Sequence, residues 1–286
     1  MPVDVLSVTL RALSFLALFQ AAGIALFLAL RQPELPNTER PLRRIGTLAA
    51  LLAAALLVAQ YLLEPARMSG ELGGVLDPAL EGIVMHSAMS VTLSWRVLGL
   101  LLIVAGLWRG GVRRDIATVI GVALLLASFT LIGHTSKDTL RWLLSPVLLA
   151  HLSVVAFWYG GLLPLYLVSA HESPQTAGWV VQRFSARAVW LVPVLLLAGL
   201  ILATLLLPNL AALRRPYGEL LIAKVAGFCA LMPLAALNRW RFGPALQRGD
   251  CVAGRRFRQL VAAEFVLLAT ILCVTAVMTT FYSPEG

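Results

Sequence analysis

The sequence of 286 residues carries very little charge. Asp, Glu, Lys and Arg together make up 13% of it, whereas soluble globular chains carry about 25%. Hydrophobic residues account for 59%, and the mean hydropathy is +0.86. This shortage of charge excludes an ordinary soluble domain and indicates an integral membrane protein.

Several chemical signatures are missing as well. The three cysteines form no CxxC pair and no other metal-binding spacing. No glycine-rich loop of the P-loop type is present, and no soluble domain is joined to the apolar segments. These absences argue against a cysteine metal site and against an ATP-driven pump. We therefore expect a protein that is not an enzyme.

Long apolar runs fill most of the chain. A helix needs about 20 apolar residues to cross a bilayer, and these runs are too long and continuous for barrel strands. We predict an all-α polytopic membrane helix bundle of about eight transmembrane helices, forming one transmembrane domain over residues 1–286. The predicted spans are 5–30, 45–63, 83–107, 115–133, 144–168, 187–207, 219–238 and 260–282.

The basic residues predict the orientation of the bundle. The net charge of +9 comes from Lys and Arg in short connections, fifteen in one alternate set of loops and five in the other. The more basic loops of a membrane protein face the cytoplasm. The asymmetry therefore predicts that both termini face outward (N-out and C-out), and it explains the positive charge without a nucleic-acid partner.

Three histidines and two methionines fall in the predicted outer part of the bundle. Met85, His86 and Met89 lie in the first two turns of the predicted span 83–107, on one sector of that helix. His134 ends the next span, and His151 lies about two turns into the one after it. Imidazole and thioether together suit Cu(I). The sequence predicts that these five residues form a metal site near the outer surface.

Four other residues are candidates because they stand inside apolar runs. Polar and ionisable side chains are costly within a membrane and often functional there. Arg96 lies nearest the middle of its span and calls for a partner inside the bundle. Lys224 and Glu264 either have a role or extend to the nearer interface, and their expected depths keep them apart. Trp158 follows His151 by seven residues, so the two share a helix face.

In this region the sequence resembles the bacterial copper resistance protein CopD family. The resemblance is strongest over residues 133–284 and rests on several short motifs in the family's order. They are Gly133-His134, His151-Leu152 with Trp158-Tyr159-Gly160-Gly161, Arg183-Phe184-Ser185, Tyr217-Gly218-Glu219-Leu220-Leu221-Ile222-Ala223-Lys224, Asn238-Arg239, Pro244 and Glu264.

The resemblance implies a multi-pass protein of the bacterial inner membrane that handles copper. Such a protein would take copper from the periplasm toward the cytoplasm, and its partners would be the lipid bilayer and a separate periplasmic copper-binding protein. Two alternatives remain open. Paired histidines in a helical bundle also ligate haem b, which would make the protein a transmembrane electron carrier. The third alternative is an assembly or scaffolding protein without a cofactor.

Overall fold

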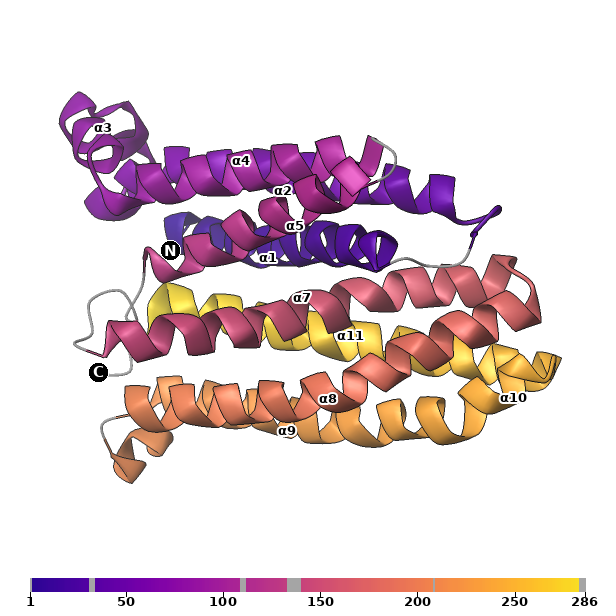
Figure 1. Cartoon of the computed structure of the whole chain (residues 1–286). Coiled ribbons are helices and arrows are strands. Elements are labelled where there is room, and N and C mark those ends of the chain that lie inside the picture. Colours follow the sequence, from indigo (N-terminus) through magenta and orange to yellow (C-terminus); the bar gives the residue numbers. More distant parts are fainter. Residues whose placement is uncertain (1, 31–33, 109–111, 133–139, 208, 283–286) are drawn as a thin grey trace.

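The computed structural model describes residues 2–30, 34–108, 112–132, 140–207 and 209–282, and within these ranges every regular element is a helix. Long helices lie side by side and form one elongated bundle (Figure 1). In chain order the α-helices are α1 Pro2–Ala29, α2 Glu39–Ser69, α3 Pro78–Met85, α4 Ala88–Trp108, α5 Val112–Ala127, α7 Arg141–His171, α8 Pro174–Leu206, α9 Pro216–Leu237, α10 Gly243–Gln247 and α11 Cys251–Phe281. Short 3-10 turns cover Leu72–Leu76, Ser128–Thr130 and Leu210–Arg214.

The prediction of an all-α polytopic membrane bundle is confirmed. Seven helices of the described chain are long and apolar enough to cross a membrane, and a shorter apolar helix covers Asp115–Thr130. This shorter helix also runs along the bundle, from the end of α4 toward the start of α7 (Figure 1). The chain therefore passes along the bundle eight times.

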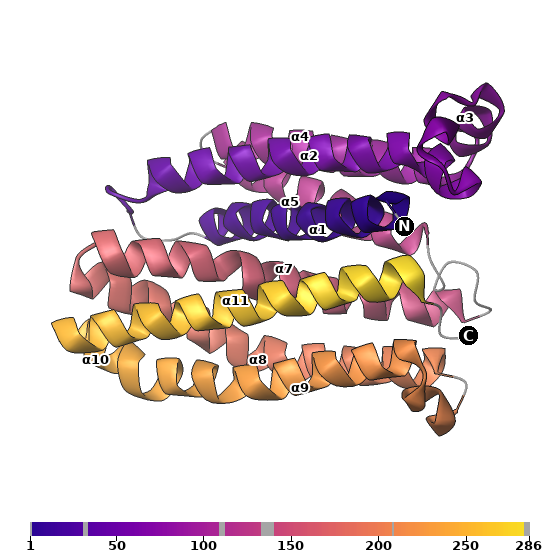
Figure 2. The ribbon, with the colours of Figure 1, turned by 180° about the vertical axis from the view of Figure 1, so that it is seen from behind.

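The two ends of the bundle differ in what they hold. The N- and C-termini, α3 and the 210–214 turn lie at one end, which we call the terminal end (Figures 1 and 2). The ends of α1, α4 and α7, the starts of α2, α5 and α8, and α10 lie at the other, which we call the basic end. Among the described arginines of the predicted Arg-rich loops, Arg43 and Arg258 lie at this end, beside the last turns of α4 and α7. Both ends of the chain lie at the same end of the bundle because the chain passes along it an even number of times.

The bundle consists of two groups of helices joined through α1. Helices α1, α2, α4 and α5 form the first group, and α7, α8, α9 and α11 form the second (Figure 1). Helix α1 packs against α2 in its own group and against α7 and α11 in the other. Its residues from Ala17 to Ala25 are nearly all inaccessible to solvent. The centre of the molecule is therefore a helix from the N-terminus.

A glycine pair brings α1 and α7 together. A Cβ added at Gly23 would overlap the Cα of Gly160, and one added at Gly160 would overlap the Cα of Gly23. The contact is sealed by Gln20, whose Nε2 donates a hydrogen bond of 3.1 Å to the Gly160 carbonyl. Small residues let membrane helices approach closely enough for backbone-to-backbone contact. Residues 160–161 of the sequence motif thus serve packing.

Most of the helices are longer than the apolar runs that predicted them, whereas α4 and α5 are shorter. Helix α11 begins at Cys251, nine residues before its predicted start, and α7 extends beyond 144–168 at both ends. An apolar run marks only the part of a helix that lies in hydrocarbon, whereas the backbone stays helical into the polar interface. Four prolines, Pro146, Pro164, Pro193 and Pro233, stand inside helices, as membrane bundles tolerate.

Arginines at the basic end also bind the helices to one another. Arg43 Nη1 donates to the Leu107 carbonyl at 2.7 Å, and Arg258 Nη1 donates to the Ser169 carbonyl at 3.0 Å. Both acceptors belong to the last turn of a helix, where carbonyls lack intrahelical partners and the helix dipole is negative. The arginines that predicted orientation therefore have a structural role too.

Candidate functional site

The most deeply buried polar group of the second helix group is the carboxyl of Glu264 on α11. Only 3% of this residue is exposed, and its Oε1 accepts a hydrogen bond of 2.6 Å from Asn238 Nδ2. The indole of Trp158 on α7 is a further hydrogen-bonding neighbour of the carboxyl. The three residues come from three helices, so the carboxyl is held by α7, α11 and the end of α9.

Helix lengths place this polar cluster near the middle of the bundle. Glu264 lies seventeen residues before the end of α11, and Trp158 lies seventeen residues after the start of α7. At 1.5 Å per residue, both are about 25 Å from the terminal end. Glu264 therefore lies farther from the start of its helix than the apolar run alone indicates, because α11 begins nine residues before that run.

A local irregularity positions Asn238. Helix α9 passes into a π-helical turn over Asn238–Phe242 and then into α10. Such turns insert a residue into the helix and occur frequently at functional sites. Asn238 is 6% exposed, and its Oδ1 is buried without a hydrogen-bond partner in the described structure. The amide is thus held by one bond to Glu264 and retains an unused acceptor.

His151 occupies a second position, between α7, α8 and α9. The Leu195 carbonyl of α8 accepts a hydrogen bond from its ring, and the buried Nδ1 has no partner among the residues described. The ring also lies beside Gly199, where an added Cβ would come within 3.6 Å of Cε1. A histidine whose other nitrogen is fixed by a carbonyl presents its free nitrogen as a metal ligand.

Lys224 of α9 is an electrostatic neighbour of the His151 ring. It lies eight residues into α9, about 12 Å from the terminal end, and His151 lies about 15 Å from it. Within the described ranges the Lys224 ammonium has neither a hydrogen bond nor an ion pair, and no contact with Glu264 is found. Lys224 and His151 each stand out in the sequence as a polar residue within an apolar run, but nothing in the chain order indicates that they are neighbours.

One turn further along α9, Phe228 packs edge-on against Trp158, with ring centroids 6.3 Å apart. Trp158 itself is 3% exposed. Its ring therefore lies between α9 and the Glu264 carboxyl of α11. The predicted common face of His151 and Trp158 is consistent with their surroundings, since both side chains have a neighbour on α9.

The predicted helix that carries Met85, His86 and Met89 is interrupted, so their placement on one helix sector was wrong. Helix α3 ends at Met85, and α4 begins at Ala88. The reason is Ser87, whose hydroxyl accepts a hydrogen bond of 3.2 Å from Met89 N at the start of α4. Serine is a preferred residue at this position of a helix.

The structure gives these three residues different surroundings. Met85 and His86 are exposed at the terminal end, whereas Met89 is half-buried beside Arg96. His86 Nδ1 donates to the Gly82 carbonyl at 2.8 Å, which leaves Nε2 free to act as a ligand. No contact between His86 and His151 is found in the described part of the chain. His134 lies outside the described residues, so the predicted site of five ligands stays a prediction.

Arg96 is 9% exposed and lies within the first helix group. Its Nε donates to Ser128 Oγ at 3.0 Å, and the guanidinium stacks 4.4 Å from the centre of the Phe129 ring. The partners expected for Arg96 are therefore a hydroxyl and an aromatic face. Arg11 of α1, which the sequence analysis did not select, is an electrostatic neighbour of Arg96.

Among the described residues, no group of three or more His, Cys, Asp and Glu side chains could hold a metal ion. Among the described histidines, a ring nitrogen with a free lone pair is found at the terminal end (His86 Nε2), within the bundle (His151 Nδ1) and at the basic end (His171 Nε2). The arrangement can therefore offer single imidazole ligands at three depths. It also holds a buried carboxyl at Glu264, farther from the terminal end than His151.

Fold and site together define a multi-pass α-helical membrane protein whose bundle encloses a carboxyl, an amine and an imidazole. Residues 178–278 match the family described as Copper resistance protein D, and residues 1–142 match the family described as Copper resistance protein D-like, N-terminal domain. The chain belongs to the copper resistance protein D family.

A curated relative supports the same assignment. The chain is 28% identical to Copper resistance protein D of Pseudomonas syringae pv. tomato, over 99% of this chain and 98% of the relative. No solved structure matches the chain significantly. The relationship therefore rests on sequence over nearly the whole length, and it supports a role in copper resistance.

Proposed function

We propose that this protein transports copper across the bacterial inner membrane, from the periplasm at the terminal end toward the cytoplasm at the basic end. The family supports the handling of copper. The observation that carries the proposal is His151, which offers an unpartnered, buried Nδ1 inside the bundle. A soft ion such as Cu(I) accepts imidazole readily.

His86 and His151 would bind copper in succession. His86 is exposed at the terminal end with Nε2 free, and His151 lies about 15 Å into the bundle. Their separate surroundings favour two steps over one shared ion. Met85, Met89 and His134 remain candidate ligands near the first step. A separate periplasmic copper-binding protein would deliver the ion to the exposed end.

Passage beyond His151 would bring copper toward the buried cluster of Glu264, Asn238 and Trp158. A carboxylate in that position would compensate a positive ion in a low-dielectric surrounding, where an unpaired charge is most costly. The Lys224 ammonium would act in the opposite sense, because it repels a cation at His151. Such a path would pass His151 and Lys224 first and the cluster of Glu264, Asn238 and Trp158 after them.

The first experiment measures copper directly. Purified protein is loaded with Cu(I), and the bound metal is determined for the wild type, His151→Ala and His171→Ala. His171 is a matched control, because its Nδ1 also bonds a backbone carbonyl, that of Leu167 at 3.0 Å, but at the basic end. We expect His151→Ala to lose bound copper and His171→Ala to retain it.

The copper content of cells then tests transport. It should rise when the wild-type protein is expressed and should rise less when His151→Ala is expressed. Equal cellular copper with the wild type and with His151→Ala would contradict His151 as a ligand. A Soret band in the visible spectrum of the purified protein would show that the histidines bind haem instead of copper. Direction depends on orientation, which reporter fusions after residue 282 and within 243–250 would determine. A cytoplasmic signal at the C-terminus would reverse the proposed direction.

A further inference from the structure

A small cavity lies inside the first helix group near the terminal end. Its volume is ≈ 30 Å³, and it is partly open, lined by residues of α2 and α4 and by Ile132. The lining residues are Leu57, Gln60, Tyr61, Met89, Thr92, Leu93, Arg96 and Ile132. A cavity of this kind among membrane helices is empty only if it is apolar. This one is lined by a guanidinium, a phenol, an amide and a hydroxyl.

Arg96 brings an incompletely bonded cation to the cavity. It is more than nine-tenths buried, and only its Nε has a hydrogen-bond partner, Ser128 Oγ. The two terminal nitrogens donate to no described residue. A guanidinium has five N–H donors in a fixed plane. Four of these donors therefore have no acceptor among the residues that the structure describes.

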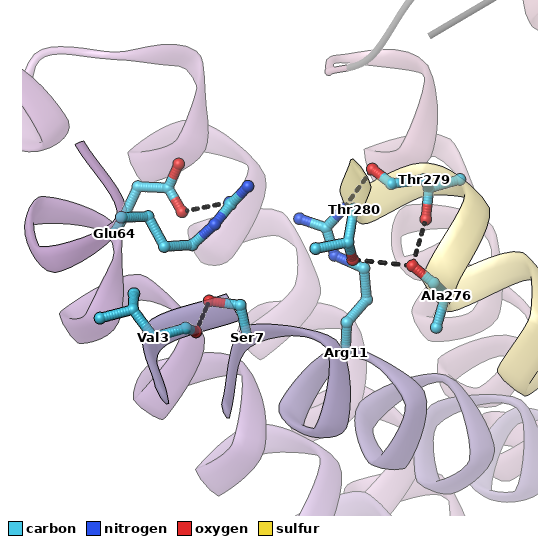
Figure 3. A network of polar contacts seen from close by, with 8 residues as sticks. Val3, Ser7, Arg11, Glu64, Ala276, Thr279 and Thr280 are labelled. Atoms are coloured by element: carbon cyan, nitrogen blue, oxygen red, sulfur yellow. Dashed lines mark hydrogen bonds and ion pairs between the residues drawn. The ribbon is translucent and has the colours of Figure 1, made fainter. Parts of the chain in front are cut away.

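Within the described structure, Arg96 also lacks negative charge in its surroundings. Arg11 is its electrostatic neighbour, and Arg11 Nη1 donates to the Thr279 carbonyl of α11 at 2.6 Å (Figure 3). The carboxylate of Glu64, an electrostatic neighbour of Arg11, is bonded to Arg67 at 2.8 Å. These four side chains, three arginines and one glutamate, together carry an excess of two positive charges.

We propose that the cavity binds one small inorganic anion, chloride, between Arg96 and Tyr61. An uncompensated guanidinium inside a membrane costs several kcal/mol, and a water molecule would solvate it without neutralising it. Tyr61 lines the cavity, and its hydroxyl has no hydrogen bond in the described structure, so it is a second donor.

The size of the cavity selects the anion. A site needs only about 10–15 Å³ of such space to hold one water molecule, so ≈ 30 Å³ has room for one or two waters or one small ion. A monatomic halide fits this space, whereas the tetrahedral oxyanions sulfate and phosphate are too large. Met89 lines the same wall, so the anion would also lower the positive potential beside its sulfur atom.

In the experiment, chloride replaces gluconate step by step in a solution of the purified protein in detergent, so that the ionic strength stays constant. Binding to the folded state alone raises the Tm as the site fills. We expect a saturable rise of roughly several degrees with chloride or bromide, no saturable rise with sulfate, and about one radioactive chloride bound per chain at saturation.

Two variants are compared with the wild type. Arg96→Gln should lose the saturable rise and the bound chloride. Arg44→Gln removes an exposed arginine at the basic end and should retain both. Should Arg96→Gln fail to fold, Tyr61→Phe keeps the charge and removes one donor, and its affinity for chloride should fall about tenfold.

Three results would overturn the proposal. The first is a rise of equal size in the wild type and in Arg96→Gln, which would mark a general salt effect. The second is equal stabilisation by sulfate and chloride, which would exclude a site of this size. The third is the absence of bound radioactive chloride in a wild-type protein that is folded.

Discussion

Helices α1 and α9 have the same hydropathy and opposite positions in the bundle. The most apolar window of each has a mean hydropathy of 2.1, yet 67% of that window in α1 is buried by protein and only 6% in the helix that spans Pro216–Gln247. Hydropathy therefore identifies membrane helices without telling which of them form the centre. The reason is that lipid tails are as apolar as leucine, so burial against protein brings no hydrophobic gain.

The distinguishing property of α1 is the size of its side chains. The segment from Ala21 to Ala25 contains four alanines or glycines, and Gly23 contacts the Gly160 backbone of α7. Gly227 of α9 faces the side chains of Ile271 and Leu267, with an added Cβ 3.0 Å from Cγ1 of Ile271. Small residues that meet another backbone mark the central helix, whereas small residues beside long side chains do not.

The difference also separates stability from function. The centre of the bundle is a close helix contact, and the candidate residues His151 and Lys224 lie where α7 meets the outer helices α8 and α9. Helices held by few buried contacts open locally at a lower free-energy cost than the core. A path for an ion between such helices needs no disturbance of the α1–α7 contact.

The largest effect is expected at that contact. Gly160→Leu places a side chain against the Cα of Gly23, where two backbones leave no room for adjustment. Overpacking a core that can adjust costs about 1–3 kcal/mol, so we expect a loss of at least about 3 kcal/mol or failure to fold. Thermal unfolding of the purified protein measures it.

Gly199→Ala provides the matched control in the outer group. Its added Cβ would lie 3.6 Å from the His151 ring, an ordinary contact distance. We expect its Tm to stay within a few degrees of the wild type. A Tm loss in Gly199→Ala as large as that in Gly160→Leu would refute the distinction between a rigid centre and adaptable outer helices.

An intermediate effect is expected at the buried carboxyl. Asn238→Leu removes the 2.6 Å donor to Glu264 and leaves a buried acceptor unpaired. Unpaired buried groups cost about 1–3 kcal/mol, and charged ones more. Glu264→Gln should cost less, because the new amide can donate to the unpartnered Asn238 Oδ1. Denaturation of both variants would show the order, and a greater loss in Glu264→Gln would contradict it.

The sequence predicted the type of fold and most of the unusual residues, because both follow from composition and local pattern. Long apolar runs can only be membrane helices, and a Glu or Lys inside such a run is conspicuous wherever the helix packs. The interruption after Met85 had a local signal as well. Ser87 precedes an apolar segment as a helix-capping residue does, but the surrounding apolar run concealed it.

The pairing of these residues could not be predicted in the same way. Asn238 reaches hydrogen-bonding distance of Glu264 because of a π-helical turn. Lys224 is an electrostatic neighbour of His151, and their helices are distant in the chain. Hydropathy does not order helices around a bundle, and without that order the partner of a buried group stays unknown. The Arg11–Arg96 relation across α1 and α4 was missed for the same reason.

The smallest effect on stability, and the most informative one for function, is expected at Lys224 on the outer helix α9. Lys224→Met retains the length of the side chain and removes a charge that has no described partner. The free energy of unfolding should not fall, because the substitution removes a charge that is costly to hold within a membrane. The affinity for Cu(I) should change more, because the Lys224 charge beside His151 repels a bound cation.

Removal of that repulsion should tighten Cu(I) binding about tenfold, which corresponds to about 1.4 kcal/mol of Coulomb energy. Uptake by cells should fall, since an ion that is held more tightly leaves more slowly. Competition with a Cu(I) chelator measures the affinity, and Lys224→Arg, which keeps the charge, should behave as the wild type. If Lys224→Met binds and transports copper as the wild type does, the amine only reaches the membrane interface and has no part in the path.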